Sequence, residues 1–170
     1  MKGFLLGLIL CLFATTSQGE SRDVQQHFFN QHLGDLKAEL DTAKQEGKQG
    51  ILLMFELEDC PFCHRMKATI LNQSEVQDYY RQHFLVFSMD VDGASALVDF
   101  SGKQTTEKKF ALENRARATP VFIFFDLSGK PLTRFTGAAK DTGEFMALGR
   151  YVVEGAYKTM PFARYKAPVK

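Results

Sequence analysis

The chain has 170 residues, of which 45% are hydrophobic, and its formal net charge is +1. This length suits one domain with a substantial core, and the near-neutral charge gives no indication of nucleic acid as a partner. Tryptophan is absent and 16 residues are phenylalanine, so phenylalanine is expected to fill much of the core.

Residues 1–19 are predicted to be a cleaved signal peptide. Lys2 supplies a positive start, the run from Phe4 to Phe13 is apolar but short for a membrane span, and Ser17-Gln18-Gly19 offers small residues for cleavage. An uncleaved anchor is the alternative. Because export leads to an oxidising compartment, we expect the mature protein to lie in such a compartment.

Two segments precede the first strand. Residues 21–33 are polar with a few aromatic side chains, and they are expected to form either a helical arm or a loose segment. Asp35 to Glu46 is predicted to be an amphipathic helix, because Leu36, Leu40 and Ala43 share one face.

An apolar stretch from Ile51 to Leu57 then runs directly into a pair of cysteines. Both alternating faces are mostly apolar, which predicts a central strand covered on both sides. Pro61 suits the first position of a helix, so Cys60 is expected at a helix N-terminus. Unpaired N–H groups and the helix dipole stabilise a thiolate there, which predicts Cys60 as the attacking thiol and Cys63 as the resolving one.

The expected mature chain keeps only these two cysteines, since Cys11 lies in the apolar run and would be removed with it. A disulfide between Cys60 and Cys63 closes a very small loop, so it stabilises the fold little. Its expected purpose is therefore thiol–disulfide exchange rather than structural support.

Two polar side chains near the cysteines are candidate supporting residues. Glu56 lies on the predicted central strand, where its carboxylate is expected to relay a proton to Cys63 or to be a charge at the wet end of the strand. His64, when protonated, would stabilise a thiolate at Cys60, whereas Asp59 would oppose it; the alternative for His64 is an exposed residue without a role.

Helical and strand patterns continue after the cysteines. A helix is expected from Pro61 to about Leu71. Ser74-Glu75-Val76-Gln77 is typical of a capping box and predicts another helix that ends near His83. Phe84 to Met89 is predicted to be a second buried strand.

The middle of the chain is expected to be mostly connecting structure. Asp90 and Asp92 are interpreted as turn residues rather than metal ligands, because too few oxygen ligands follow them at suitable spacing. Residues 94–104 are expected to form a long connection, with a turn at Ser101-Gly102. Thr105 or Thr106 is expected to cap the next helix.

Pro120 introduces a strongly apolar strand, although proline cannot donate a hydrogen bond to a sheet. One solution is a cis Thr119–Pro120 peptide bond at the first residue of the strand. Ser128-Gly129-Lys130 is predicted to be a hairpin turn that leads to a return strand from Leu132 to Phe135.

The last helix is predicted to begin at the capping box Asp141-Thr142-Gly143-Glu144 and to end at Gly155. Residues 158–170 contain prolines and several basic residues, and they are expected to be a flexible basic tail. No internal repeat is evident in the sequence.

The order of these features resembles the thioredoxin superfamily: a strand, Cys60-Pro61-Phe62-Cys63, a helix, a strand, a helix, Thr119-Pro120, a hairpin and a C-terminal helix. Phe55-Glu56 before the cysteines, the loop containing Gly102 and Ala118-Thr119-Pro120 resemble more closely the exported thioredoxin-like proteins of the SoxW type. The resemblance implies an α/β thioredoxin fold over residues 20–157, with a central mixed β-sheet flanked by helices on both faces.

The same resemblance implies a site and a reaction. Pro120 would lie beside the disulfide, and the Thr119 backbone would pair with an extended chain of the partner. Pro61 and Phe62 would separate the reacting thiols. The expected function is periplasmic exchange with protein disulfides or dithiols, mainly as a reductant supplied by a membrane electron donor, with no cofactor, no metal and no nucleic acid.

Three other interpretations stay open at this point. The protein would instead be a DsbA-like oxidant if electrons flow the other way. Cys60-x-x-Cys63-His64 also matches the attachment motif of c-type haem, which would make the chain an electron carrier. A binding module is the third, in which the cysteines form a structural disulfide or hold a metal; Cys60, Cys63 and His64 are potential zinc ligands, but the adjacent Cys63 and His64 would point apart on a helix.

Overall fold

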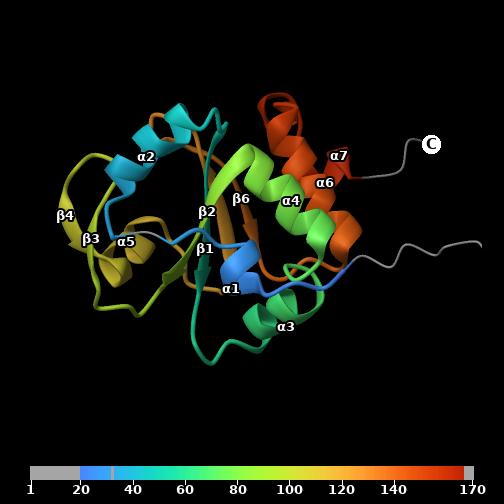
Figure 1. Ribbon diagram of the computed structural model, residues 1–170, viewed down its shortest axis with the longest axis horizontal. Helices are drawn as coiled ribbons and strands as arrows, with labels where there is room; N and C mark the ends of the chain where they lie inside the picture. The colour runs from blue at the N-terminus through green and yellow to red at the C-terminus, as the bar shows by residue number, and fades with distance from the viewer. Residues whose placement is uncertain (1–19, 32, 167–170) are drawn as a thin grey trace, which may run out of the picture.

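The protein is built around a mixed sheet of four strands, β1 (Gly50–Glu56), β2 (Phe84–Asp90), β5 (Val121–Phe125) and β6 (Pro131–Thr136) (Figure 1). Their order is β2-β1-β5-β6, in which β1 runs parallel to β2 and antiparallel to β5, and β5 runs antiparallel to β6. The structure is a computed structural model that describes residues 20–31 and 33–166. The predicted signal peptide over residues 1–19 lies outside the described residues.

Helices cover both faces of this sheet, as the sequence predicts (Figure 1). The remaining elements are α1 (Val24–His27), α2 (Leu36–Gln45), α3 (Pro61–Thr69), α4 (Ser74–His83), β3 (Ala96–Val98), β4 (Gln104–Thr106), α5 (Glu107–Glu113), α6 (Thr142–Val153), the 3-10 turn η1 (Ala156–Lys158) and α7 (Phe162–Tyr165). Among residues 20–31 and 33–166, no helix has the length and apolar character needed to cross a membrane.

Alternate residues of β1 enter two separate cores, which confirms the predicted central strand. Leu52 and Met54 pack in a cluster with side chains from α3, α4 and α6. Ile51, Leu53 and Phe55 pack on the opposite face with side chains from α2 and α5. All five side chains are fully buried. The central strand is therefore held rigidly up to the residue where the chain turns toward the cysteines.

The segment before α2 is packed on the sheet rather than loose. Phe28 and Phe29, at the end of the short helix α1, are buried in the core beside α4 and α6. Asn30 follows them and lies along the outer edge of β2. Its backbone N–H donates to the carbonyl oxygen of Val86 at 2.6 Å, and its side-chain oxygen accepts the Val86 N–H at 2.9 Å.

The start of α4 differs from the prediction. Gln73, not Ser74, is the N-cap residue, and its side chain makes no capping hydrogen bond. The N–H of Ser74 instead donates to the carbonyl oxygen of Glu20 at 2.9 Å, and Ser21 forms an isolated bridge with Gln73. A distant backbone segment satisfies the helix terminus, so the predicted capping box is wrong.

The connection predicted over residues 94–104 contains strands of its own. β3 and β4 form a small antiparallel sheet, and the N–H of Val98 donates to the carbonyl oxygen of Gly34 at 2.7 Å. The cap of α5 is Thr106, whose hydroxyl accepts the N–H of Lys109 at 3.3 Å. Each strand has three residues, too few for alternation to be recognised in the sequence.

A five-residue pattern, Asp-x-Ser-Gly-Lys, closes both hairpins, although the sequence analysis finds no repeat. It runs from Asp99 to Lys103 between β3 and β4, and from Asp126 to Lys130 between β5 and β6. In each turn the aspartate Oδ1 accepts hydrogen bonds from the serine N–H, the serine hydroxyl and the lysine N–H, at 2.6–3.0 Å. Gly102 and Gly129 have positive φ, which glycine adopts without strain.

These turns are expected to make stability depend on pH. Burial raises the pKa of Asp99 and Asp126, but hydrogen bonds from serine and lysine outweigh it, so each pKa lies below the ordinary value of 3.8. Stability from a lowered pKa is present above the unfolded value and is lost as the pH falls through the folded value. Asp126→Asn should therefore cost about 1 kcal/mol at pH 7 and progressively less below about pH 4.

Urea unfolding of Asp126→Asn and of the unchanged protein at pH 7 and at pH 3 measures this difference. Asp41→Asn is the control, because Asp41 is an exposed residue within α2. A loss of stability at Asp126 that is the same at both pH values would contradict the expectation.

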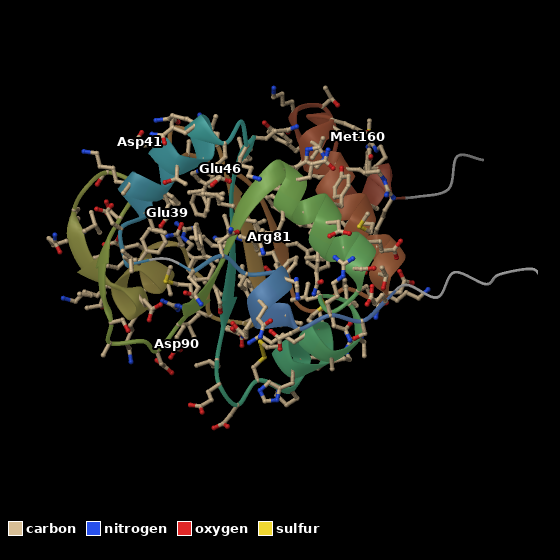
Figure 2. All side chains as sticks on the ribbon, viewed as in Figure 1. Glu39, Asp41, Glu46, Arg81, Asp90 and Met160 are labelled. Atoms are coloured by element: carbon tan, nitrogen blue, oxygen red, sulfur yellow. A yellow bond between two sulfur atoms is a disulfide. The ribbon has the colours of Figure 1, made fainter. Side chains whose placement is uncertain are left out.

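Residues 158–166 are packed on the protein, so the predicted flexible tail is wrong for this part. The ring of Phe162 lies 5.9 Å from that of Phe135 and 5.4 Å from that of Tyr151. The hydroxyl of Tyr151 donates to the carbonyl oxygen of Met160 at 2.6 Å. Met160 is labelled in Figure 2. The prediction rested on the prolines and basic residues of this segment, but its aromatic side chains pack on the domain. Residues 167–170 lie outside the described residues.

Candidate active site

Cys60 and Cys63 lie where the chain leaves the central strand and enters α3. Cys60 is the N-cap of this helix and Pro61 its first residue, in agreement with the sequence. The N–H of Cys63 donates to the sulfur of Cys60 at 3.2 Å, so an amide of the helix N-terminus faces this sulfur. The two residues form a disulfide, and their Cα atoms are 5.2 Å apart.

The two sulfurs differ in access. Both cysteines belong to the core cluster beside β1, but Cys60 is 7% exposed, whereas Cys63 is 0% exposed. Between them, the ring of Phe62 is 60% exposed. A group that approaches from solvent therefore meets Cys60 and Phe62 first. Covalent attachment of haem at both cysteines would require Cys63 to leave the core, so this site fits that alternative poorly.

Thr119 and Pro120, far away in the sequence, meet the cysteine pair. The sulfur of Cys60 lies 3.5 Å from the carbonyl oxygen of Thr119. The Thr119–Pro120 peptide bond is cis, and Pro120 directly precedes β5. The carbonyl oxygen of Pro120 accepts the N–H of Gly137 at 2.8 Å, which ties this segment to the end of β6.

Glu56, the last residue of β1, is held by two side chains that the sequence analysis missed. Its side chain is 12% exposed, and its carboxylate accepts a hydrogen bond from Lys67 Nζ at 2.7 Å and another from the hydroxyl of Ser88. Lys67 lies four residues after Cys63 on α3. This spacing can be read from the sequence, and it places the two side chains on the same face of the helix. Ser88 gave no such signal, because its position opposite β1 depends on the strand register.

His64 is exposed on α3, as one of the predicted alternatives for this residue expects. Its Nε2 lies 2.6 Å from the carbonyl oxygen of Glu58, a contact that the sequence did not predict. This hydrogen bond connects α3 to the loop that precedes Cys60. Within the part of the chain that the structure describes, no group of three or more His, Cys, Asp or Glu residues is arranged to hold a metal ion.

A polar pocket of about 380 Å³ opens beside the site and reaches Glu56. Asp90, which Figure 2 labels at the end of β2, is one of the residues that line this pocket. The residues that line it are Glu56, Leu57, Glu58, His64, Lys67, Ser88 and Asp90. A pocket with this many polar groups can hold water, so it can connect Glu56 to bulk solvent.

Known proteins share this fold. Residues 36–153 match the family described as thioredoxin-like domain. A thioredoxin-fold protein from Helicobacter pylori is 17% identical, with a TM-score of 0.67 over 84% of this chain and 91% of that one. A thioredoxin from Thermus thermophilus is 26% identical, with a TM-score of 0.53 over 67% and 80% of the two chains.

The oxidised C-terminal domain of DsbD from Neisseria meningitidis is 22% identical, with a TM-score of 0.51 over 72% of this chain and 97% of that domain. No curated protein matches the sequence.

The matched region 36–153 contains both cysteines and Pro120. A disulfide between near neighbours in sequence contributes little to stability, and a pair with one sulfur near the surface is suited to exchange with other thiols. The chain therefore belongs to the thioredoxin-like family, and it is a thiol–disulfide oxidoreductase that carries the Cys60–Cys63 pair.

Proposed function

We propose that this protein is an exported, periplasmic reductant of protein disulfides, related in function to the SoxW type. The observation that carries the proposal is the unequal access of the two sulfurs, because Cys60 lies near the surface and Cys63 is fully buried. A partner can form a bond with Cys60, and Cys63 is then in position to break it. In this proposal residues 1–19 direct export and are removed.

The reaction begins with the reduced protein. The Cys60 thiolate attacks one sulfur of the partner's disulfide, that S–S bond breaks, and a mixed disulfide forms. Cys63 then gives up its proton, with Glu56 as the acceptor, and its thiolate attacks the sulfur of Cys60. The partner leaves as a dithiol that has gained two electrons, and a membrane electron donor reduces the Cys60–Cys63 disulfide again.

The surface around Cys60 supports a protein as the partner. Phe62 is 60% exposed between the two cysteines and offers an apolar contact to a docking chain. Thr119 lies against Cys60, where its backbone is available to pair with an extended segment. We propose that these two residues orient the partner's disulfide toward Cys60, and that Pro61 and Pro120 shape the surface on either side.

Charge before Cys60 supports the reducing direction. Glu58 and Asp59 are both exposed and stand immediately before Cys60. Negative charge beside a thiol opposes formation of its thiolate. This makes the dithiol less stable relative to the disulfide, and a less stable dithiol gives up its electrons more readily.

The reduction potential tests the proposal. The protein is prepared from the periplasmic fraction, where its first residue is expected to be Glu20, and is equilibrated with thiol–disulfide buffers. A value at or below about −230 mV is expected, whereas a value near −120 mV would identify an oxidant. Asp59→Asn should raise the potential because it removes a negative charge, and Asp41→Asn on α2 should not.

Two results would overturn the proposal as a whole. One is the absence of a reversible two-thiol transition in the titration. The other is a Soret absorption band in the purified protein, which would support the haem-carrier interpretation of Cys60-x-x-Cys63-His64. If a full-length chain is recovered from the membrane fraction, residues 1–19 are an uncleaved anchor and not a cleaved signal peptide.

A further inference from the structure

We propose that Lys67 and Ser88 are positioning residues that hold the Glu56 carboxylate where it accepts the proton of Cys63. This inference rests on the proposed function, because it concerns the step in which Cys63 releases the partner. It adds two residues, from α3 and β2, that carry no recognisable motif.

Glu56 and Cys63 are directed toward the same core. Glu56 follows Leu52 and Met54 at spacings of two along β1, so the three share one strand face. That face packs against the cluster that contains Cys63. Lys67 stands one helical turn beyond Cys63, so these two side chains are neighbours on α3.

Three contacts keep Lys67 and Glu56 together on this side of the sheet. Lys67 Nζ lies 2.7 Å from the Glu56 carboxylate and 5.8 Å from the centre of the Phe29 ring. The hydroxyl of Ser88 donates to the same carboxylate from the neighbouring strand. A carboxylate that is largely shielded from water needs such donors to remain in place. Without them, Glu56 would turn toward solvent and away from α3.

The buried position of Cys63 creates the need for an acceptor. Cys63 has no exposed surface, so its thiol cannot pass a proton directly to bulk water. The polar pocket beside α3 reaches Glu56 and opens to solvent past Glu58, His64 and Asp90, the other charged or titratable groups that line it with Lys67. Water in this pocket can therefore carry the proton away from Glu56.

In the proposed step, Cys63 loses its proton before it attacks Cys60. The Cys63 S–H bond breaks, its proton passes to the Glu56 carboxylate, directly or through one water molecule, and the electron pair stays on sulfur. The Cys63 thiolate attacks Cys60, and a Cys60–Cys63 bond replaces the bond between Cys60 and the partner. The partner's sulfur leaves with the electron pair and takes a proton from water, while Glu56 returns its proton to the pocket.

An aryl disulfide that releases a coloured thiolate separates the two steps of exchange. Attack by Cys60 releases one thiolate, and attack by Cys63 releases the second. Glu56→Gln is expected to slow the second release by about 100-fold, the scale of general acid–base catalysis, and to leave the first unchanged. Lys67→Met should also slow the second release and leave the first unchanged, because the Glu56 carboxylate loses a donor that holds it in place.

Two further variants separate positioning from general loss of structure. Lys67→Arg keeps the charge and the hydrogen bond, and it should restore most of the rate. Lys103→Met removes an exposed ion pair with Glu113 (2.8 Å) far from the cysteines, and it should change neither step. Ser88→Ala should slow the second release less than Glu56→Gln, because it removes only one of the donors to Glu56.

The proposal is overturned if Glu56→Gln leaves the second release unchanged. It is also overturned if Lys67→Met slows the second release equally in the presence and absence of Glu56, because Lys67 would then act independently. Failure of the proposed function gives a different result: the reduction potential of the unchanged protein would be that of an oxidant, whatever the rates of the two releases.

Discussion

Cys63→Ser is expected to hold its partner as a stable covalent complex. Cys60 remains able to attack the partner's disulfide, but a serine hydroxyl at position 63 cannot attack the resulting bond at neutral pH. Cys60→Ser should reduce exchange to the uncatalysed rate, because the remaining Cys63 is fully buried. The two substitutions therefore give opposite results on the same substrate: one accumulates the mixed disulfide and the other never forms it.

Non-reducing gel electrophoresis with a reduced variant and an oxidised protein substrate detects the complex. The complex should disappear when a reductant is added, and it should not form in the double variant Cys60→Ser/Cys63→Ser. A complex formed by Cys60→Ser at the rate of Cys63→Ser would reverse the roles assigned to the two cysteines.

Phe145→Ala is expected to be the most damaging of the substitutions discussed, at a cost of about 3–5 kcal/mol. The Phe145 ring is fully buried, and its centre lies 4.6 Å from that of Tyr80 and 5.0 Å from that of Phe122. Removal of the Phe145 ring leaves a cavity between α6, α4 and β5, and both aromatic contacts are lost. The carbonyl oxygen of Phe145 also accepts the buried hydroxyl of Tyr80 at 2.6 Å, so a backbone shift would disturb that hydrogen bond.

Phe62→Ala provides a matched control for this change. The same atoms are removed from a ring that is 60% exposed, so the free energy of unfolding should change by no more than about 0.5 kcal/mol. Urea unfolding measures both variants, and equal losses would contradict the packing described for Phe145. Phe62→Ala should instead weaken the reaction with protein substrates.

The central strand and the cysteine pair could be predicted from the sequence because their signals are local. The unbroken apolar run over Ile51–Phe55 predicts two buried faces without knowledge of the neighbouring strands. The cap at Cys60 and the helix that starts at Pro61 depend on adjacent residues alone. The family resemblance then supplied the mixed sheet with helices on both faces, which local patterns do not contain.

The features that the sequence analysis missed depend on contacts between distant segments. Ser88 approaches Glu56 only because β1 and β2 pair in one particular register. Gln73 replaces Ser74 as the helix cap because the N–H of Ser74 donates to the carbonyl oxygen of Glu20, the first residue that the structure describes. Phe162 holds the C-terminal segment through a ring on β6. Composition and spacing carry no information on these three contacts.

Asn30 protects the sheet against self-association. An edge strand with free N–H and C=O groups invites a strand from another molecule, and this is a common start of aggregation. On the outer side of β2, Asn30 already occupies both backbone groups of Val86. β6, at the opposite edge, begins with Pro131, which has no N–H to offer. Release of residues 20–31 would expose β2 together with the rings of Phe28 and Phe29, and would open the folded domain to intermolecular strand addition.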